Sequence, residues 1–138
     1  MEILYPAKVT QEADGMFFVQ FVGLEEAFTD GETLEEALFN ASEVLTLTLL
    51  GRMAEGMDIP QPENGIEGAH YVAPDAKTQA ALLLRQARGD RTYAELARAL
   101  ETSWDVAKRL EDANHWPSLR ALDRAATALG KRLVLSFS

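Results

Sequence analysis

The side chains that could carry out chemistry in this sequence are two histidines, a few serines and many carboxylates, whereas cysteine is absent. Without cysteine, disulfide bonds, thiolate catalysis and cysteine-ligated metals are excluded. His70 and His115 lie in different halves of the chain, and neither has a second histidine at metal-ligand spacing. Ser42 and Ser103 lack the context of a nucleophile elbow, and no glycine-rich loop follows a strand. We therefore expect no enzyme and no cofactor.

The carboxylates raise one further chemical possibility, because several of them converging on two magnesium ions could cleave a phosphodiester. Asp14 falls at the tip of a predicted turn, and Glu32, Glu35 and Glu36 fall at a predicted helix start. Turn formation, helix capping and the helix dipole explain carboxylates at such places without a metal. We therefore expect no metal site.

Another stretch, residues 92–110, has the spacing of a binding element. Thr92 and Glu95 form a capping box, and Ser103 can cap a second helix after a turn of about three residues. Two apolar stripes with a small residue between them complete the pattern of a helix-turn-helix. The stretch resembles the repressor/Cro type, in which glycine is common at the position of Glu101 because the turn favours a positive φ. A helical hairpin that only builds the core is the alternative.

This resemblance implies that the helix after Ser103 enters a DNA major groove. Lys108 is expected to contact bases, whereas Asp105 would repel a phosphate. Trp104 could contact DNA or pack between helices, and the sequence leaves both open. The predicted DNA-contacting residues are Ser103, Trp104, Lys108 and Arg109, with Arg98 and Arg120 as further phosphate contacts.

The charges of these 138 residues, −9 in total, are divided unevenly along the chain. Residues 1–74 hold fourteen acidic and two basic residues, a net charge of −12. Residues 75–138 hold eleven basic and eight acidic residues, a net charge of +3. An acidic half attracts a basic protein, whereas a basic half can approach phosphates. The division predicts two modules whose partners have opposite charges.

The acidic half is predicted to contain a three-stranded antiparallel meander, a long helix and a fourth strand. Asp14-Gly15 and Asp30-Gly31 mark turns between segments of alternating apolar residues. The strands are expected at residues 3–11, 16–22, 27–29 and 69–73. A proline- and glycine-rich loop precedes the last strand, and the domain boundary is expected near Pro74.

The long helix of this half is predicted to begin after Thr33, which has capping-box spacing with Glu36. Its inner stripe is joined further along by a second apolar edge formed by Val44, Leu47 and Leu50. We therefore expect the distal half of the helix to be buried more widely. An edge this broad is also a candidate packing surface for another subunit.

The basic half is predicted to contain four helices and a final strand. One helix spans residues 75–88, two form the helix-turn-helix, and the fourth follows Pro117-Ser118 with Leu119 on its inner face. A lone strand cannot satisfy its own backbone, so we expect residues 131–137 to pair with the same strand of a second chain. The resulting homodimer, with a tetramer left open, would present two recognition helices to a pseudo-palindromic site. The dimerising side chains are Leu133, Val134, Leu135 and Phe137.

The order of these motifs resembles that of a HicB-type antitoxin of a type II toxin–antitoxin system with a C-terminal helix-turn-helix. In the first half the resemblance rests on Gly15–Val19, Phe21-Val22 and above all Thr29–Ala37, where a strand end, a glycine turn and a Glu-Glu-Ala helix start follow one another. In the second half it rests on Glu95–Arg98 and Ala128–Lys131. It implies an α+β protein, with a partial RNase H-like toxin-binding domain at residues 1–74 and an all-α DNA-binding and dimerisation domain at residues 75–138.

The resemblance also implies a function with two partners. The first domain would lack catalytic activity and would mask a small basic HicA-type toxin, an enzyme that cleaves mRNA. The second domain would bind the operator of its own operon and repress it. Candidate toxin-contacting residues lie in an acidic loop and at the helix start: Glu25, Glu26, Asp30, Glu32 and Glu35.

Two other functions remain open from the sequence. A transcription regulator that senses a small ligand would have a closed apolar pocket in residues 1–74. A magnesium-dependent nuclease, the less favoured alternative, would have clustered carboxylates. No leader and no apolar run of membrane-spanning length is present, so we expect a cytoplasmic protein without a membrane partner.

Overall fold

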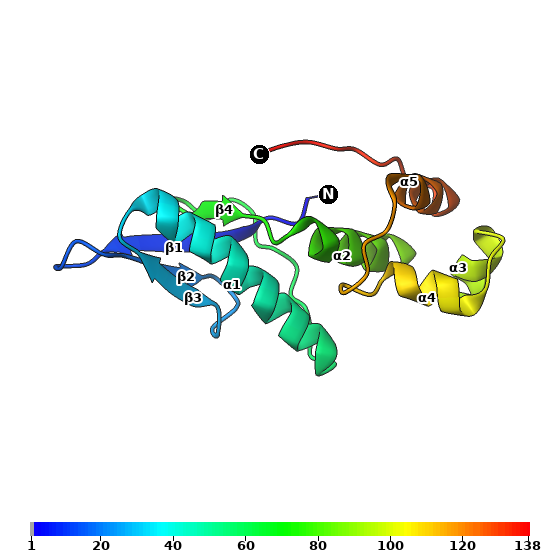
Figure 1. The fold of residues 1–138 in the computed structure, drawn as a ribbon, viewed down its shortest axis with the longest axis horizontal. Helices are drawn as coiled ribbons and strands as arrows, with labels where there is room; N and C mark the ends of the chain where they lie inside the picture. Colours follow the sequence, from blue (N-terminus) through cyan, green and yellow to red (C-terminus); the bar gives the residue numbers. More distant parts are fainter. Residues whose placement is uncertain (1) are drawn as a thin grey trace. The chain divides into compact units, whose positions relative to one another are not determined.

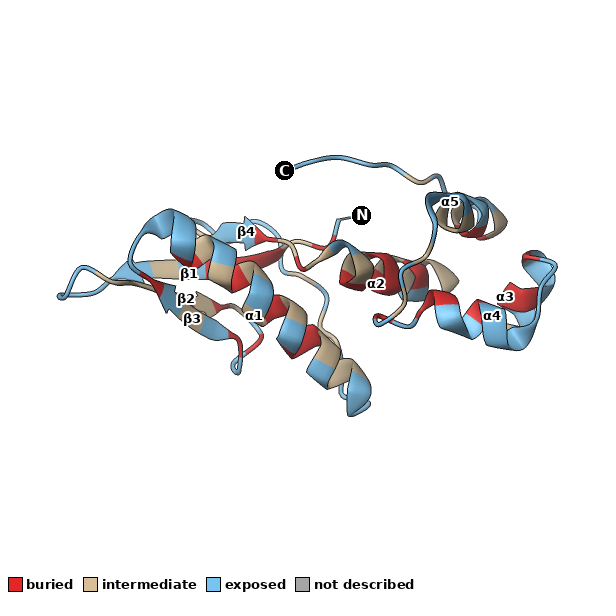
Figure 2. Ribbon diagram, in the orientation of Figure 1, coloured by how far each residue is buried: buried red, intermediate tan, exposed pale blue. Residues whose placement is uncertain are grey.

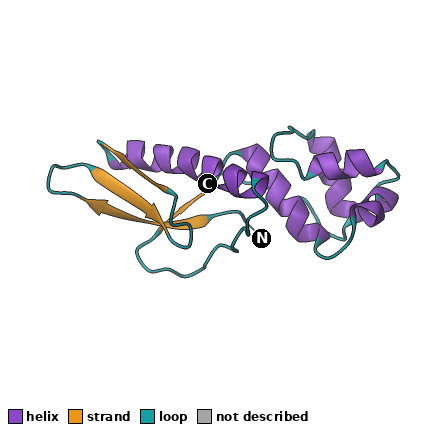
Figure 3. Cartoon of the chain, turned by 90° about the horizontal axis from the view of Figure 1, so that it is seen from below, coloured by secondary structure: helices purple, strands orange, loops and turns teal. Residues whose placement is uncertain are grey.

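A computed structural model describes residues 2–138, which divide into two units, residues 2–75 and residues 76–138. The first unit consists of an antiparallel sheet and one long helix, and the second is helical (Figures 1 and 3). The α+β class predicted from the sequence is confirmed. Among the described residues, no helix has the length and apolar character needed to cross a membrane.

The sheet of the first unit has four strands in the order β3-β2-β1-β4, with antiparallel neighbours throughout. Its strands are β1 (Tyr5–Gln11), β2 (Phe17–Phe21), β3 (Phe28–Gly31) and β4 (His70–Val72). The predicted meander with a returning fourth strand is therefore present. In the middle of the sheet, Val19 of β2 lies opposite Val9 of β1 and Thr29 of β3. Because a strand is pleated, successive side chains of β2 face opposite sides of the sheet.

The long helix α1 (Leu34–Ala54) packs against one face of this sheet (Figure 1). Thr33 caps it as predicted, its hydroxyl accepting a hydrogen bond from the Glu36 amide at 3.1 Å. The turn into the helix requires glycine at position 31, because a Cβ on Gly31 would lie 2.5 Å from the Ala37 nitrogen. The fully buried core between helix and sheet is formed by Ala37, Ala41, Leu45 and Leu49 together with Ala7, Val19 and Phe21.

The distal half of α1 is buried more widely than its first half, as predicted, because Leu45, Thr48 and Leu49 are all buried there, but Leu47 takes no part in this burial. Leu47 is 68% exposed and Phe39 is 65% exposed. At 100° per residue, both side chains lie on the side of the helix opposite Ala41 and Leu45. Figure 2 shows the buried residues of α1 interrupted by exposed ones along its whole length. A single sheet covers only one side of a helix, and the apolar residues on the other side remain in solvent.

The second unit contains α2 (Ala76–Arg88), α3 (Tyr93–Ala99), α4 (Trp104–Leu110) and α5 (Leu119–Ala128). Three of these helices have the N-caps that the sequence predicts, since Thr92, Ser103 and Ser118 each accept a hydrogen bond from an amide three residues further on. The apolar core is formed by Leu84, Leu96, Ala97, Leu100, Ala107, Leu110, Ala125 and Leu129.

The last eight residues form no strand within the single chain. Val134 is 80% exposed and Phe137 is fully exposed, so these apolar side chains have no cover in one chain. Pairing of residues 131–137 with the same segment of a second chain stays a prediction. The placement of Leu119 on the inner face of α5 is wrong: it is 63% exposed, because Ala125 and Leu129 fix the inner face one residue out of phase with it.

Candidate functional site

The turn between α3 and α4 has the backbone conformation that the sequence pattern requires. Glu101 has a φ of 54°, in the left-handed region that favours glycine. The amide of Thr102 donates to the Ala97 carbonyl at 2.9 Å, and the Ser103 hydroxyl then caps α4. The turn is therefore tight despite having glutamate at its left-handed position, and it fixes where α4 begins.

The helix α4 turns a polar face to solvent. Ala107 and Leu110 are buried, so helical geometry places Asp105, Lys108 and Arg109 on the opposite side, where all three are exposed. Lys108 and Arg109 lie in the last turn, and Asp105 lies between them and the start of the helix. The outer face thus presents two cations and one carboxylate side by side.

Trp104 lies at the surface where α3 and α4 meet. It is 47% exposed and contacts Tyr93 edge to face, with ring centroids 5.7 Å apart. The Lys108 ammonium lies 5.0 Å from the centre of the indole ring. Trp104 thus packs against α3 with part of its ring and exposes the rest, and the indole and Lys108 share one surface.

A buried ion pair beneath this surface was missed by the sequence reasoning. The Glu111 side chain is only 2% exposed, and its carboxylate accepts two hydrogen bonds from the Arg88 guanidinium and one from the Tyr93 hydroxyl at 3.4 Å. The Arg88 guanidinium also lies 4.3 Å from the centre of the Tyr93 ring. The carboxylate raises the pKa of Arg88 further above its usual range. One carboxylate therefore joins the ends of α2 and α4 to the start of α3.

The other predicted cations come from neighbouring helices. Arg98 is exposed in the last turn of α3, and Arg120 is exposed in the first turn of α5. Arg120 lines an open hollow together with Leu119, Asp123, Leu133 and Leu135. The four cationic residues predicted to contact DNA are thus distributed over three helices. Among the six predicted DNA-contacting residues, the structure shows one side-chain contact, that between Lys108 and Trp104.

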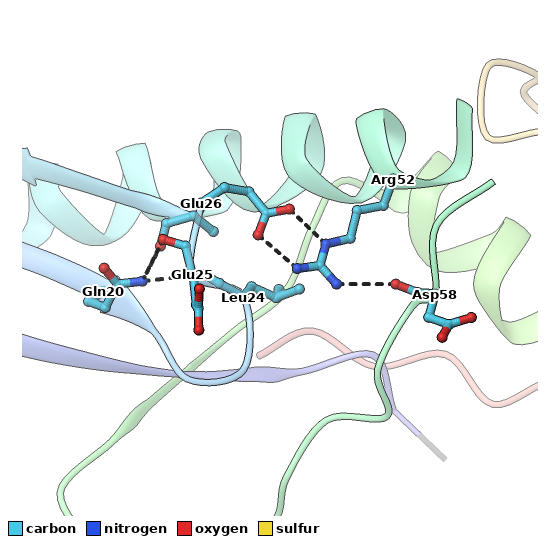
Figure 4. Close-up of polar contacts among 7 residues, drawn as sticks. Gln20, Leu24, Glu25, Glu26, Arg52 and Asp58 are labelled. Atoms are coloured by element: carbon cyan, nitrogen blue, oxygen red, sulfur yellow. Dashed lines mark hydrogen bonds and ion pairs between the residues drawn. The ribbon is translucent and has the colours of Figure 1, made fainter. Parts of the chain in front are cut away.

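In the first unit, the acidic loop between β2 and β3 is held by specific contacts (Figure 4). The Gln20 side-chain amide donates to the backbone carbonyls of Leu24 and Ala27, both at 3.2 Å. Glu26 accepts two hydrogen bonds from Arg52 of α1, at 2.7 and 2.8 Å. This guanidinium lowers the pKa of Glu26 to about 2. Glu26 therefore stays ionised, but its charge is already paired within the chain.

The remaining predicted toxin-contacting carboxylates are exposed. They sit in the same loop, in β3 and at the start of α1, namely Glu25, Asp30, Glu32 and Glu35. Asp14 has the turn role expected of it, since its carboxylate accepts the Met16 amide at 2.9 Å. Across residues 2–138, no three histidine or carboxylate side chains lie close enough together to hold a metal ion.

Comparison with known proteins decides the family. The family of HicB-like antitoxins of bacterial toxin–antitoxin systems matches residues 4–80. Antitoxin HicB of Escherichia coli K12 is 31% identical over 133 residues, which cover 95% of this chain and 96% of that protein. The chain belongs to the HicB-like antitoxin family. Antitoxin HicB 1 of Photorhabdus laumondii is 30% identical over 134 residues, covering 96% of this chain and 85% of that protein. The HicB-like match includes the whole sheet and α1, and the two relatives extend the similarity across α2 to α5.

Proposed function

We propose that this HicB-like chain neutralises a small basic HicA-type toxin through residues 2–75. The observation that carries the proposal is the charge of this unit. Residues 1–74 have a net charge of −12, and one of their two basic residues, Arg52, is already paired with Glu26. The exposed carboxylates attract a cationic protein, accelerate its encounter and disfavour nucleic acid at the same surface. Glu25, Asp30, Glu32 and Glu35 are the proposed contacts, and Glu26 shapes the loop that carries Glu25.

Co-expression tests this role. Under this proposal a HicA-type protein is expected to be encoded beside this chain, and that protein is induced alone and together with the chain while growth is followed. We expect growth to stop with the toxin alone and to recover with the chain. A variant with glutamine or asparagine at all four exposed positions should rescue less well, whereas Glu67→Gln, another exposed carboxylate, serves as the control. Absence of rescue by the wild-type chain would contradict the proposal.

We further propose that residues 76–138 bind the operator of the chain's own operon as a homodimer. The support is the tight turn at Glu101 and an exposed α4 face with Lys108 and Arg109, flanked by Trp104. Lys108 would contact base edges, with Arg109, Arg98 and Arg120 on phosphates and Ser103 at the groove-facing start of the helix. The proposed location is the cytoplasm, because the chain would meet both an mRNA-cleaving toxin and operator DNA there.

The segment at residues 131–138 supports the dimer, because the exposed Val134, Leu135 and Phe137 and the half-buried Leu133 would gain cover by strand pairing. A two-fold pair would present two α4 helices to a pseudo-palindromic operator, and a tetramer would follow from pairing of dimers.

Electrophoretic mobility shifts with the DNA upstream of the operon test the DNA-binding role. We expect Lys108→Ala and Trp104→Ala each to weaken binding about tenfold or more, the size of one lost base contact. Arg85→Ala removes an exposed cation from α2 and should have little effect. Unchanged affinity in both α4 variants would mean that α4 is not the recognition helix.

A further inference from the structure

The solvent-facing side of α1 carries a regular stripe of carboxylates and large apolar groups. Glu36, Phe39, Glu43 and Leu47 recur every three or four residues, and all four are exposed. At 100° per residue they fall within one narrow face, opposite the buried Ala41 and Leu45. We refer to these four residues as the α1 stripe.

The α1 stripe has a composition that fold stability does not require. Phe39 and Leu47 are 65% and 68% exposed, although the opposite side of the same helix already supplies the core. Exposed apolar side chains contribute favourably to free energy only when a partner covers them and removes their surface from water. Aromatic and apolar anchors surrounded by charges are the usual make-up of an interface core and its rim.

We infer that the α1 stripe is the surface on which the basic toxin docks, an inference that rests on the proposed antitoxin function. Phe39 and Leu47 would enter apolar pockets of the toxin, and Glu36 and Glu43 would pair with lysine or arginine around those pockets. Glu32 and Glu35 lie just before and in the first turn of the same helix and extend the acidic rim. The loop with Glu25 would then steer the approach rather than form the centre of the contact.

A basic partner fits the α1 stripe better than a second copy of the chain does. In a two-fold contact the same patch meets itself, so the two stripes would bring four carboxylates and no cation into one interface. Like charges brought together in this way oppose association. A cationic partner instead meets two carboxylates that no ion pair of the described structure engages.

Calorimetric titration of the 138-residue chain with the same HicA-type protein tests the inference. We expect Phe39→Ala and Leu47→Ala each to weaken the affinity at least tenfold, as truncation of a central anchor does. Glu43→Lys should also weaken the affinity at least tenfold at low salt, and by less at high salt because the added salt screens the charge. Phe28→Ala is the matched control, since Phe28 is 53% exposed in β3 of the same unit and should change the affinity less than threefold.

The possible outcomes separate this inference from the proposed function. If the wild-type chain binds the toxin and the Phe39→Ala, Leu47→Ala double variant stays within threefold of it, the stripe is not the docking surface. A larger loss with Phe28→Ala, or a changed oligomeric state of the double variant with unchanged toxin affinity, would also overturn the inference. If the wild-type chain does not bind the toxin at all, the proposed antitoxin function itself fails.

Discussion

The ion pair between Arg88 and Glu111 leads to a prediction about the stability of the second unit. Replacing Arg88 by methionine keeps the volume of the side chain but leaves the Glu111 carboxylate, 2% exposed, with one long hydrogen bond from Tyr93. Removing one partner of a buried pair costs roughly 3–5 kcal/mol, because the other charge stays buried without compensation. Arg88 itself is 18% exposed, so water can partly replace it. We therefore expect Arg88→Met to lower the free energy of unfolding by about 3 kcal/mol.

Two variants separate this effect from a general loss of packing. The double variant Arg88→Met, Glu111→Leu removes both charges and should regain most of the loss, ending within about 1 kcal/mol of the wild type. Arg52→Met breaks the pair with Glu26, whose carboxylate is 46% exposed and open to water, so this change should cost no more than about 1 kcal/mol.

Tryptophan fluorescence during urea unfolding provides the assay, because both tryptophans, Trp104 and Trp116, belong to the second unit. A unit of this size has a small stability reserve, so a loss of about 3 kcal/mol moves the midpoint visibly. If Arg88→Met costs less than about 1 kcal/mol, or if the double variant is as unstable as the single one, the pair does not compensate the burial of Glu111.

Three further substitutions test other features. Gly31→Ala should cost about 1–3 kcal/mol on thermal unfolding followed by circular dichroism, because its Cβ would overlap the Ala37 backbone; a wild-type melting curve would show that the turn relaxes freely. The Glu26 carboxyl should titrate near pH 2 by NMR, and a normal pKa would contradict the pairing. Because folding lowers this pKa, the stabilising effect of Glu26 is present above about pH 4.5 and is lost as the pH falls toward 2. The stabilities of Glu26→Gln and wild type should therefore differ at neutral pH and converge in acid. Glu101→Gly should stabilise the chain by about 0.5–1 kcal/mol in urea unfolding, since glycine tolerates the φ of 54°; destabilisation would mean that the glutamate side chain contributes more than the strain it causes.

Features set by neighbours in the sequence could be predicted. The caps Thr33, Thr92, Ser103 and Ser118 depend on an acceptor and an amide three residues apart, and all four are present. The order of the first three strands followed from turns at glycine and from alternating apolar residues, whereas the pairing of β4 with β1 was not predicted. The resemblance to repressor-type turns predicted a positive φ at position 101, and Glu101 has it although glycine is the usual residue there.

Features set by distant parts of the chain could not be predicted. The sequence does not show how wide a surface covers α1, so Leu47 was assigned to the buried side although the sheet reaches only the other face. The pairing of Glu26 with Arg52 joins residues 26 positions apart, which no local pattern indicates. Glu111 offered one signal that was overlooked: it follows Ala107 by four residues and therefore shares its buried face.

Inhibition of RNA cleavage tests the central claim, that this HicB-like chain neutralises a toxin, most directly. The purified HicA-type protein is incubated with an mRNA in the presence of increasing amounts of the 138-residue chain, and intact RNA is measured. We predict that cleavage falls in proportion to the added chain and stops near equimolar amounts, since the chain acts by binding the toxin. Undiminished cleavage in the presence of a large excess of the folded chain would contradict the claim.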